Sequence, residues 1–345
     1  MAQEQMTRLG SKRLQLTRVV DPLGSQDAKK TFISAVCRGL LSNPKTLPFS
    51  FFYDEVGSAL FEKICKLPEY YLTRTEDSIL RSEAVKMVSG WPVGQPPPTI
   101  VELGSGSAEK TRRLIEAGIK RFQSLRYVPI DVSATAVEES SMELLRVFPT
   151  LRINAFVGDY QDCLADIGKR FEGPKWILFL GSSLGNYDLE SAENLLRRLA
   201  FVMHPSDRLL LGTDLAKNSL ILEAAYDDPQ GITARFNKNL LARINRELQG
   251  DFVLGQFHHR AIYNSAAERV EMHLISRVNQ VVTIPRANLE VAFLEGESIH
   301  TENSHKYTVE GLHRLAAATG FKEEEAWTDP KEWFRVQSWR PSRRN

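Results

Sequence analysis

A short glycine-containing segment is the first feature of the chain that could bind a ligand. Residues 101–107 read VELGSGS and end a strand-like run. Glycines at such a point let the backbone turn sharply and approach a ligand where a Cβ would collide. A dinucleotide fingerprint needs a third glycine at position 109, but that residue is Glu109, whose carboxylate would oppose a phosphate. Alone, the segment is equally consistent with a tight strand-to-helix turn.

Acidic residues end the next two strand-like runs. Asp131 stands where a carboxylate can accept hydrogen bonds from two ribose hydroxyls. Asp159 and Tyr160 stand where a carboxylate can meet an exocyclic amine and a ring can pack on a purine. Each aspartate alone is also a candidate helix N-cap. The carboxyl ends of parallel strands meet at one edge of a sheet. The glycine segment, Asp131 and the pair Asp159–Tyr160 end three successive strands, so together they favour an adenosyl ligand without a pyrophosphate, which is S-adenosylmethionine.

A fourth segment offers amide chemistry. Residues 179–187 read FLGSSLGNY and end another strand-like run. The Asn186 side chain provides both a carbonyl acceptor and an N–H donor, the pair that the amino group and carboxylate of an amino acid require. An asparagine that only forms a turn is the alternative, with about equal weight.

The elements around these segments predict an α/β fold. Strand-like runs alternate with helical periodicity, which indicates βαβ units and a parallel sheet with helices on both faces. The strand-like runs are 99–103, 127–130, 153–157, 176–180 and 209–211, and the helical ones are 108–120, 134–147 and 189–203.

Helices are expected before this region and antiparallel strands after it. The expected helices are 27–41, 57–67 and one that starts at Thr73, where Glu76 completes a capping-box pattern. A short strand is expected at 14–19. Residues 220–226 and 232–248 have helical spacing, 252–263, 269–282 and 289–293 alternate like antiparallel strands, and a helix at 309–319 precedes a strand pair at 321–327 and 333–339.

These changes of pattern divide the chain into a parallel-sheet core and a second, inserted domain. We expect the core at residues 75–216, completed by 306–345. The second domain is expected to combine residues 1–74 with the inserted residues 217–305.

Composition excludes several classes of function. The 345 residues carry 44 Lys and Arg against 43 Asp and Glu, which argues against a nucleic-acid binder that relies on clustered positive charge. Three scattered cysteines indicate neither a disulfide framework nor a metal site. The N-terminus does not resemble a signal peptide, and the apolar runs are too short to cross a bilayer. We therefore expect a cytoplasmic protein that binds neither nucleic acid nor membrane.

Seven motifs together resemble the histidine-specific Nα-methyltransferases of ergothioneine biosynthesis. They follow the family's order between about residues 27 and 339, which argues against a chance match. The motifs are YDEVGS (53–58), LPEYYLTRTE (67–76), GSSLGN (181–186), GTD (212–214), AYD (225–227), EMHL (271–274) and TENS (301–304).

The resemblance implies a fold and a set of site residues. The fold is a class I, Rossmann-like methyltransferase sheet with an inserted α+β substrate-binding domain. The residues that would hold S-adenosylmethionine are Gly104, Lys110, Asp131, Asp159 and Tyr160. Those that would hold L-histidine are Tyr70, Asn186, Tyr226, Glu302 and Ser304, with Tyr53, Phe61, Gly181, Ser183 and Met272 lining the same pocket, and Tyr53 and Asn186 would act directly in catalysis.

The residue types suit that reaction. An ionised Glu302 can accept a hydrogen bond from an imidazole N–H, worth roughly 1.5–3 kcal/mol, and Ser304 can serve the other ring nitrogen. Without its flanking motif, Glu302 would read as a solvated strand-end carboxylate. The α-amine must be neutral to attack the sulfonium methyl in line. Three transfers would give the trimethylammonium betaine hercynine, with Tyr53 or water accepting protons and no metal required.

Other functions stay open at this point. The substrate is alternatively another amino acid or a tryptophan-derived amine, and the chain is alternatively a non-catalytic S-adenosylmethionine-binding protein. An NAD-dependent oxidoreductase lacks the third glycine. The neighbours His258 and His259 should point to opposite faces of a strand and so cannot share a metal. We expect a monomer.

Overall fold

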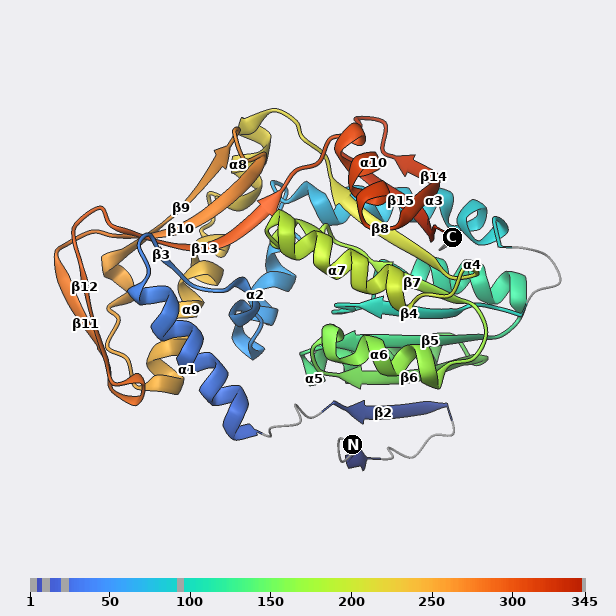
Figure 1. Cartoon of the computed structure of the whole chain (residues 1–345), viewed down its shortest axis with the longest axis horizontal. Coiled ribbons are helices and arrows are strands. Elements are labelled where there is room, and N and C mark those ends of the chain that lie inside the picture. Colours follow the sequence, from blue (N-terminus) through green and yellow to red (C-terminus); the bar gives the residue numbers. More distant parts are fainter. Residues whose placement is uncertain (1–4, 8–12, 20–24, 92–95, 343–345) are drawn as a thin grey trace. The chain divides into compact units, whose positions relative to one another are not determined.

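A computed structural model describes residues 5–7, 13–19, 25–91 and 96–342. The chain divides into two compact units (Figure 1). The first unit comprises Met1–Pro22, Leu72–Ala216 and Tyr307–Asn345, and the second comprises Leu23–Tyr71 and Lys217–Lys306.

The first unit is built on a sheet that has nine strands within the described residues. In spatial order they are β1 (Gln5–Thr7), β2 (Leu14–Arg18), β6 (Leu151–Val157), β5 (Leu125–Asp131), β4 (Thr99–Leu103), β7 (Lys175–Phe179), β8 (Arg208–Asp214), β15 (Phe334–Pro341) and β14 (Phe321–Thr328). The strands from β2 to β8 in this order are parallel, and β15 is antiparallel to both of its neighbours. The predicted α/β class is confirmed.

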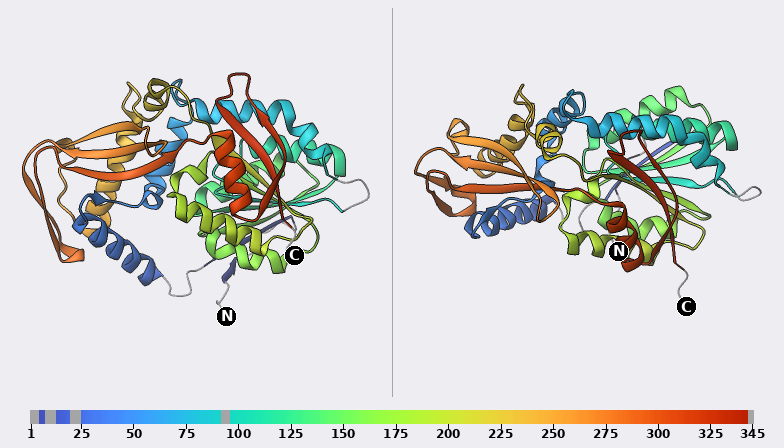
Figure 2. Two further views of the ribbon diagram at one scale, coloured as in Figure 1. Left: turned by 45° about the horizontal axis from the view of Figure 1, so that its top comes forward. Right: turned by 90° about the horizontal axis from the view of Figure 1, so that it is seen from above.

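Helices cover both faces of this sheet (Figure 2). On one face lie α3 (Tyr71–Ser89), α4 (Thr111–Phe122) and α5 (Ala134–Val147), and on the other lie α6 (Tyr160–Arg170), α7 (Leu189–Val202) and α10 (Val309–Ala318). The second set shares an apolar cluster with strand residues such as Val101 and Phe179. The chain reverses its direction of winding between β4 and β7, where open α/β sheets bind ligands.

The second unit combines helices with antiparallel strands. Its four-stranded sheet has the order β3 (Lys45–Thr46), β13 (Ser298–His305), β10 (Arg269–Ser276) and β9 (Phe257–Asn264), and β11 (Gln280–Ile284) pairs with β12 (Leu289–Phe293). Its helices are α1 (Ser25–Leu41), α2 (Glu55–Ile64), α8 (Ser219–Tyr226) and α9 (Ile232–Leu248), with 3-10 turns η1 (Phe49–Phe52), η3 (Leu254–Gln256) and η4 (Pro285–Ala287). Alternate residues of β10 are buried, so the sheet has one buried and one partly exposed face.

The structure differs from the sequence expectations in several places. Helix α3 begins at Tyr71, so Thr73 lies inside the helix and the predicted capping box is wrong. Strand β2 pairs with β6, which places it in the parallel sheet rather than with the rest of residues 1–74. Helix α6 and strand β13 have no counterpart among the predicted elements. The run predicted as one strand at 269–282 is divided between β10 and β11. Among the described residues, no helix has both the length and the apolarity that spanning a bilayer requires.

Candidate functional site

The glycine-containing turn after β4 lies at the carboxyl edge of the first unit's sheet. Gly104 and Gly106 have φ angles of +71° and +49°, a region that residues with a Cβ adopt only with strain. A Cβ built on either glycine meets nothing within 4 Å, so the turn is open on that side. Its position is fixed because the Gly104 and Ser105 N–H groups donate to the Ile130 carbonyl of β5, at 2.9 and 3.1 Å.

Asp131, at the end of β5, is tied to the same turn. Its Oδ2 accepts from the Gly106 N–H and its Oδ1 from the Ser133 N–H, both at 2.9 Å. Burial raises the pKa of Asp131, while these backbone donors favour its ionised form. Ser133, rather than Asp131, is the N-cap of α5. The carboxylate is therefore held beside the open turn.

Asp159 and Tyr160 begin helix α6. Asp159 is the N-cap, and its carboxylate accepts from the Gln161 N–H at 2.8 Å, so the capping interpretation applies to this aspartate. The Tyr160 hydroxyl hydrogen-bonds to that of Tyr187, and its ring lies edge-on to Phe179 at a centroid distance of 5.6 Å. Both residues follow β6, beside the strand that carries Asp131.

A fully buried carboxylate, Glu76, holds the turn after β7. Both of its oxygens lie 2.9 Å from the Gly181 N–H, and the carboxylate forms an ion pair with Lys110. Glu76 thereby fixes two predicted site residues. We did not predict this role, although the spacing of Glu76 from Leu72 and Ile79 places it on the buried stripe of α3.

Asn186 ends the 3-10 turn η2 (Ser183–Asn186) that follows β7. The backbone enters this turn through Gly181 and Ser182, which both have positive φ angles, and Ser183 donates to the Leu180 carbonyl at 2.8 Å. Asn186 is half-buried, and in the described part of the chain no group hydrogen-bonds to its side-chain amide. Its donor and acceptor are therefore available to a ligand.

Four of the predicted side chains in the second unit form a chain of aromatic contacts. Tyr53 meets Phe61, Phe61 meets Tyr70, and Tyr70 meets Tyr226, at centroid distances of 5.6, 6.2 and 5.9 Å and close to edge-on. Phe236 of α9 contacts both Tyr53 and Phe61 at 5.9 Å. We call these five residues the aromatic cluster. Phe236 has no signal in the sequence that separates it from other apolar residues of its helix.

A buried lysine organises the two hydroxyls that were predicted to bind substrate. Lys306 Nζ donates to Ser304 Oγ at 2.8 Å and to the Tyr226 hydroxyl at 3.0 Å, and these hydroxyls are 2.7 Å apart. One hydroxyl of the pair must donate to the other. Lys306 therefore holds Tyr226 and Ser304 in one hydrogen-bonded group.

Glu302 lies two residues before Ser304 on β13, with Met272 opposite it in the register. The side chain is buried, and no donor among the described residues hydrogen-bonds to its carboxylate. Burial raises the pKa of Glu302 to about 8, although Lys306 opposes the shift. Burial and the neighbouring Tyr226 also raise the pKa of Tyr70, so its phenol stays protonated. Glu302 is thus a buried acid to which no described residue of this unit donates a hydrogen bond.

His259 of β9 supports Tyr226 of this group. Its Nε2–H donates to the Tyr226 carbonyl at 2.8 Å, and its Nδ1 accepts from the Asn237 amide at 2.8 Å. Burial lowers the pKa of His259, which keeps the ring neutral. His258 is exposed, so the two histidines do face opposite sides of β9, as their alternation predicts.

The predicted site residues form two sets. The first unit contains Gly104, Lys110, Asp131, Asp159, Tyr160, Gly181, Ser183 and Asn186. The second contains Tyr53, Phe61, Tyr70, Tyr226, Met272, Glu302 and Ser304. Gly181, Ser183 and Asn186, which were predicted to bind substrate, therefore belong to the unit that carries the cofactor-binding candidates.

Known proteins resemble the chain over most of its length. A family model described as "Histidine-specific methyltransferase, SAM-dependent" matches residues 32–341. Histidine N-alpha-methyltransferases from Mycobacterium tuberculosis and Mycolicibacterium smegmatis are 42% and 41% identical over 90% and 89% of this chain and 95% and 94% of their own. A 4-dimethylallyltryptophan N-methyltransferase from Epichloe festucae var. lolii is 26% identical, over 87% of this chain and 92% of its own. The solved CcbJ methyltransferase from Streptomyces caelestis matches 75% of this chain and 94% of its own, at 11% identity and a TM-score of 0.42.

Replacing Glu76 with alanine should destabilise the protein. The change removes the ion-pair partner of Lys110 and the acceptor of the Gly181 N–H in a fully buried position. We expect the free energy of unfolding to fall by at least about 2 kcal/mol. Urea unfolding followed by circular dichroism measures this, with Glu116→Ala, which breaks an exposed pair with Lys120, as the control. Equal losses in both variants would refute the role given to Glu76.

The raised pKa of Glu302 predicts a pH-dependent stability. The folded-state value of about 8 lies above the unfolded value of roughly 4.3, so the stability that this residue contributes is full below pH 4.3 and is lost as the pH rises through 8. Glu302→Gln should reduce the fall in unfolding free energy between pH 5 and 9 by more than about 1 kcal/mol. Glu310→Gln, at an exposed position, should leave the fall unchanged. Parallel profiles for wild type and Glu302→Gln would contradict the burial argument.

Proposed function

The chain belongs to the histidine-specific, S-adenosylmethionine-dependent methyltransferase family, and we propose which of its residues hold the two reactants. The chain is a histidine Nα-methyltransferase that converts L-histidine to hercynine in ergothioneine biosynthesis. The observation that carries this function is the 42% identity to a histidine N-alpha-methyltransferase over 95% of that relative's length. The assignment of residues rests on the two sets described above.

The first set fits S-adenosylmethionine. The open turn at Gly104 leaves room for the ligand, and Asp131 beside it can accept ribose hydroxyls. Lys110 offers a cation to the carboxylate of the methionyl part, while its pairing with Glu76 keeps the local charge balanced. We assign the cofactor to Gly104, Lys110, Asp131, Asp159 and Tyr160. Bound there, it supplies a methyl group activated by a sulfonium.

The second set fits the imidazole of histidine. A neutral imidazole has one N–H donor and one nitrogen acceptor. In our proposal Glu302 accepts the N–H, and the Ser304 hydroxyl, held by Lys306, donates to the other nitrogen. An N–H donor beside Glu302 favours its ionised form, so substrate binding lowers the pKa of this buried acid.

The same requirement for one ring donor and one ring acceptor disfavours an indole. An indole ring has an N–H but no ring nitrogen that accepts a hydrogen bond. Bound in this unit it could donate to Glu302 but would offer Ser304 no ring nitrogen, so it would lack a hydrogen bond worth about 0.5–1.5 kcal/mol. This difference supports histidine over the tryptophan-derived amines of the less similar relatives.

The α-amine needs positioning more than a strong base. We propose that the amide of Asn186 holds the amino and carboxylate groups of the substrate, with Gly181 and Ser183 shaping the turn. The protonated Tyr70 can donate a hydrogen bond but cannot act as a base, which leaves Tyr53 or water to accept the proton. The aromatic cluster suits a growing methylammonium through cation–π contact.

The proposal also covers the metal requirement, the oligomeric state and the location of the enzyme. Methyl transfer from a sulfonium to an amine needs no Lewis acid, so no metal takes part in the reaction. We also propose that the enzyme is a monomer. None of the three cysteines forms a disulfide, consistent with a cytoplasmic protein.

Incubation with S-adenosylmethionine and each of the twenty amino acids separately should yield a methylated product with histidine alone. Mass spectrometry should show additions of one, two and three methyl groups, with the trimethyl species as the end product. Reactions without S-adenosylmethionine are the control. Methylation of tryptophan in place of histidine would contradict the assignment of Glu302 and Ser304 to the two nitrogens of the imidazole.

Asn186→Ala should weaken substrate binding selectively. The loss of hydrogen bonds to charged groups of the substrate should raise KM for histidine by at least about tenfold, since each such bond is worth roughly 1.5–3 kcal/mol. Calorimetry should show that the affinity for S-adenosylhomocysteine changes by less than about twofold. Asn194→Ala, on the exposed side of α7, is the matched control. An equal loss of both affinities would place Asn186 at the cofactor instead.

A further inference from the structure

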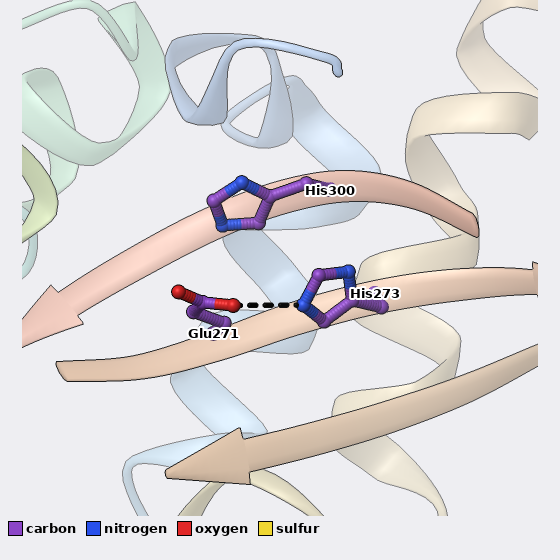
Figure 3. A group of neighbouring side chains, drawn as sticks. All are labelled: Glu271, His273 and His300. Atoms are coloured by element: carbon purple, nitrogen blue, oxygen red, sulfur yellow. Dashed lines mark hydrogen bonds and ion pairs between the residues drawn. The ribbon is translucent and has the colours of Figure 1, made fainter. Parts of the chain in front are cut away.

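Two histidines and a glutamate meet on the partly exposed face of the four-stranded sheet. Glu271 and His273 alternate on β10, and His300 lies directly opposite His273 on β13. Figure 3 shows the three side chains turned toward one another, with Glu271 beside both rings. One ligand atom of each residue lies within 4.8 Å of the other two. The proposed imidazole-binding residues do not include any of the three.

A bulge in the sheet separates this group from the substrate set. The register shifts between Met272 and His273, so that Glu302 lies opposite Met272 while His300 lies opposite His273. Residues two apart on a regular strand share a face. Here Thr301 is the extra residue, and His300 lies on the partly exposed face while Glu302 is buried.

Hydrogen bonds show where the histidine protons of the group lie. His273 Nε2–H donates to Glu271 Oε2 at 3.2 Å and His300 Nε2–H donates to the Glu302 carbonyl at 3.1 Å, because both oxygens can only accept. His273 Nδ1 is buried without a hydrogen-bond partner.

We propose that Glu271, His273 and His300 bind a divalent metal ion of the zinc class. Two imidazoles and one carboxylate are a donor set that zinc accepts, at bond lengths of about 2.0–2.2 Å. Two alternate residues on one strand and a third directly opposite on the next place all three donors on one face. The two rings are stacked at a centroid distance of 4.9 Å and an interplanar angle of 23°, so binding requires at least one ring to rotate until its nitrogen faces the ion, and water completes the coordination.

Binding balances without loss of a proton. The ion takes the place of the hydrogen that His273 Nε2 shares with Glu271 Oε2, and that ring then carries its proton on Nδ1. His300 also keeps one N–H and binds the ion through its other ring nitrogen. Arg269 donates to Glu271 Oε1 at 2.8 Å, which holds the carboxylate and leaves Oε2 for the ion. Such outer hydrogen bonds orient metal ligands.

Neighbouring arginine side chains lower the expected affinity for the metal ion. Arg260 lies opposite His273 on β9, and Arg269 lies beside Glu271. Both oppose a doubly charged ion, and only Glu271 among the three ligands is negative. We therefore expect micromolar binding, weaker than that of a closed structural zinc site. The metal is not a reactant in methyl transfer, so the proposal stands apart from the methyltransferase function.

The test is a titration of the untagged, full-length protein with Zn²⁺ in a buffer without L-histidine, which itself chelates metals. Calorimetry should show one saturable site, and Co²⁺ should give the visible absorption bands of a coordinated ion. His273→Asn and His300→Asn should each weaken Zn²⁺ binding by at least about tenfold. His258→Asn, an exposed histidine on the neighbouring strand, should bind as the wild type does. Arg260→Gln should bind more tightly, because a repelling charge is removed.

Two results would overturn the proposal. One is the absence of saturable binding up to millimolar Zn²⁺ in the wild-type protein. The other is equal affinity in wild type, His273→Asn and His300→Asn, which would place the ion elsewhere. Circular dichroism and S-adenosylhomocysteine binding show whether each variant is folded. Histidine methylation, measured separately, tests the enzymatic function and is independent of either outcome.

Discussion

A buried charge must find a partner, and this requirement organises both units. Glu76 is fully buried in the first unit, and its partners are Lys110 and the Gly181 N–H. The ion pair therefore links helix α3, the start of α4 and the turn after β7. In the second unit Glu302 is also buried, and no donor in the described part of the chain hydrogen-bonds to its carboxyl group, so burial raises its pKa to about 8 and favours the uncharged acid. The Glu76 carboxylate is satisfied by the fold, whereas in our proposal the Glu302 carboxylate forms when the substrate donates to it, which is how a site gains specificity at some cost in stability.

The parallel sheet could be predicted because its signals are local. Buried strands are short apolar runs, and α5 and α7 carry their apolar residues at helical spacing. The boundaries were less certain where two local signals compete. Thr73 and Glu76 have the spacing of a capping box, but packing makes them the interior of α3, since Glu76 is needed on its buried side. The pairing of β2 with β6 joins residues more than a hundred positions apart, and no local pattern encodes it.

The candidate site also contains residues that the sequence predicts and residues that only the structure reveals. Glu302, Ser304 and Tyr226 could be named because they stand in recognisable motifs, and the structure brings Tyr226 and Ser304 within hydrogen-bond distance. Lys306 and Phe236 could not, since one lies just past a motif and the other on a helix with ordinary apolar spacing. Their roles follow from contacts made by distant segments. The grouping of His300 with His273 could not be predicted, because it depends on the register of β13 against β10.

The register also explains how β13 can place Glu302 in the buried substrate set and His300 on the partly exposed face. In an unbroken ladder, His300 and Glu302 would project from the same face, so a buried acid and a partly exposed ligand could not both be accommodated. The extra residue at Thr301 removes the conflict, because Thr301 and Glu302 are both buried and His300 keeps its place opposite His273. The hydrogen bond from His300 to the Glu302 carbonyl spans the bulge and holds its geometry. A change on the partly exposed face is thus connected, through one backbone carbonyl, to the residue that we assign to the imidazole of the substrate.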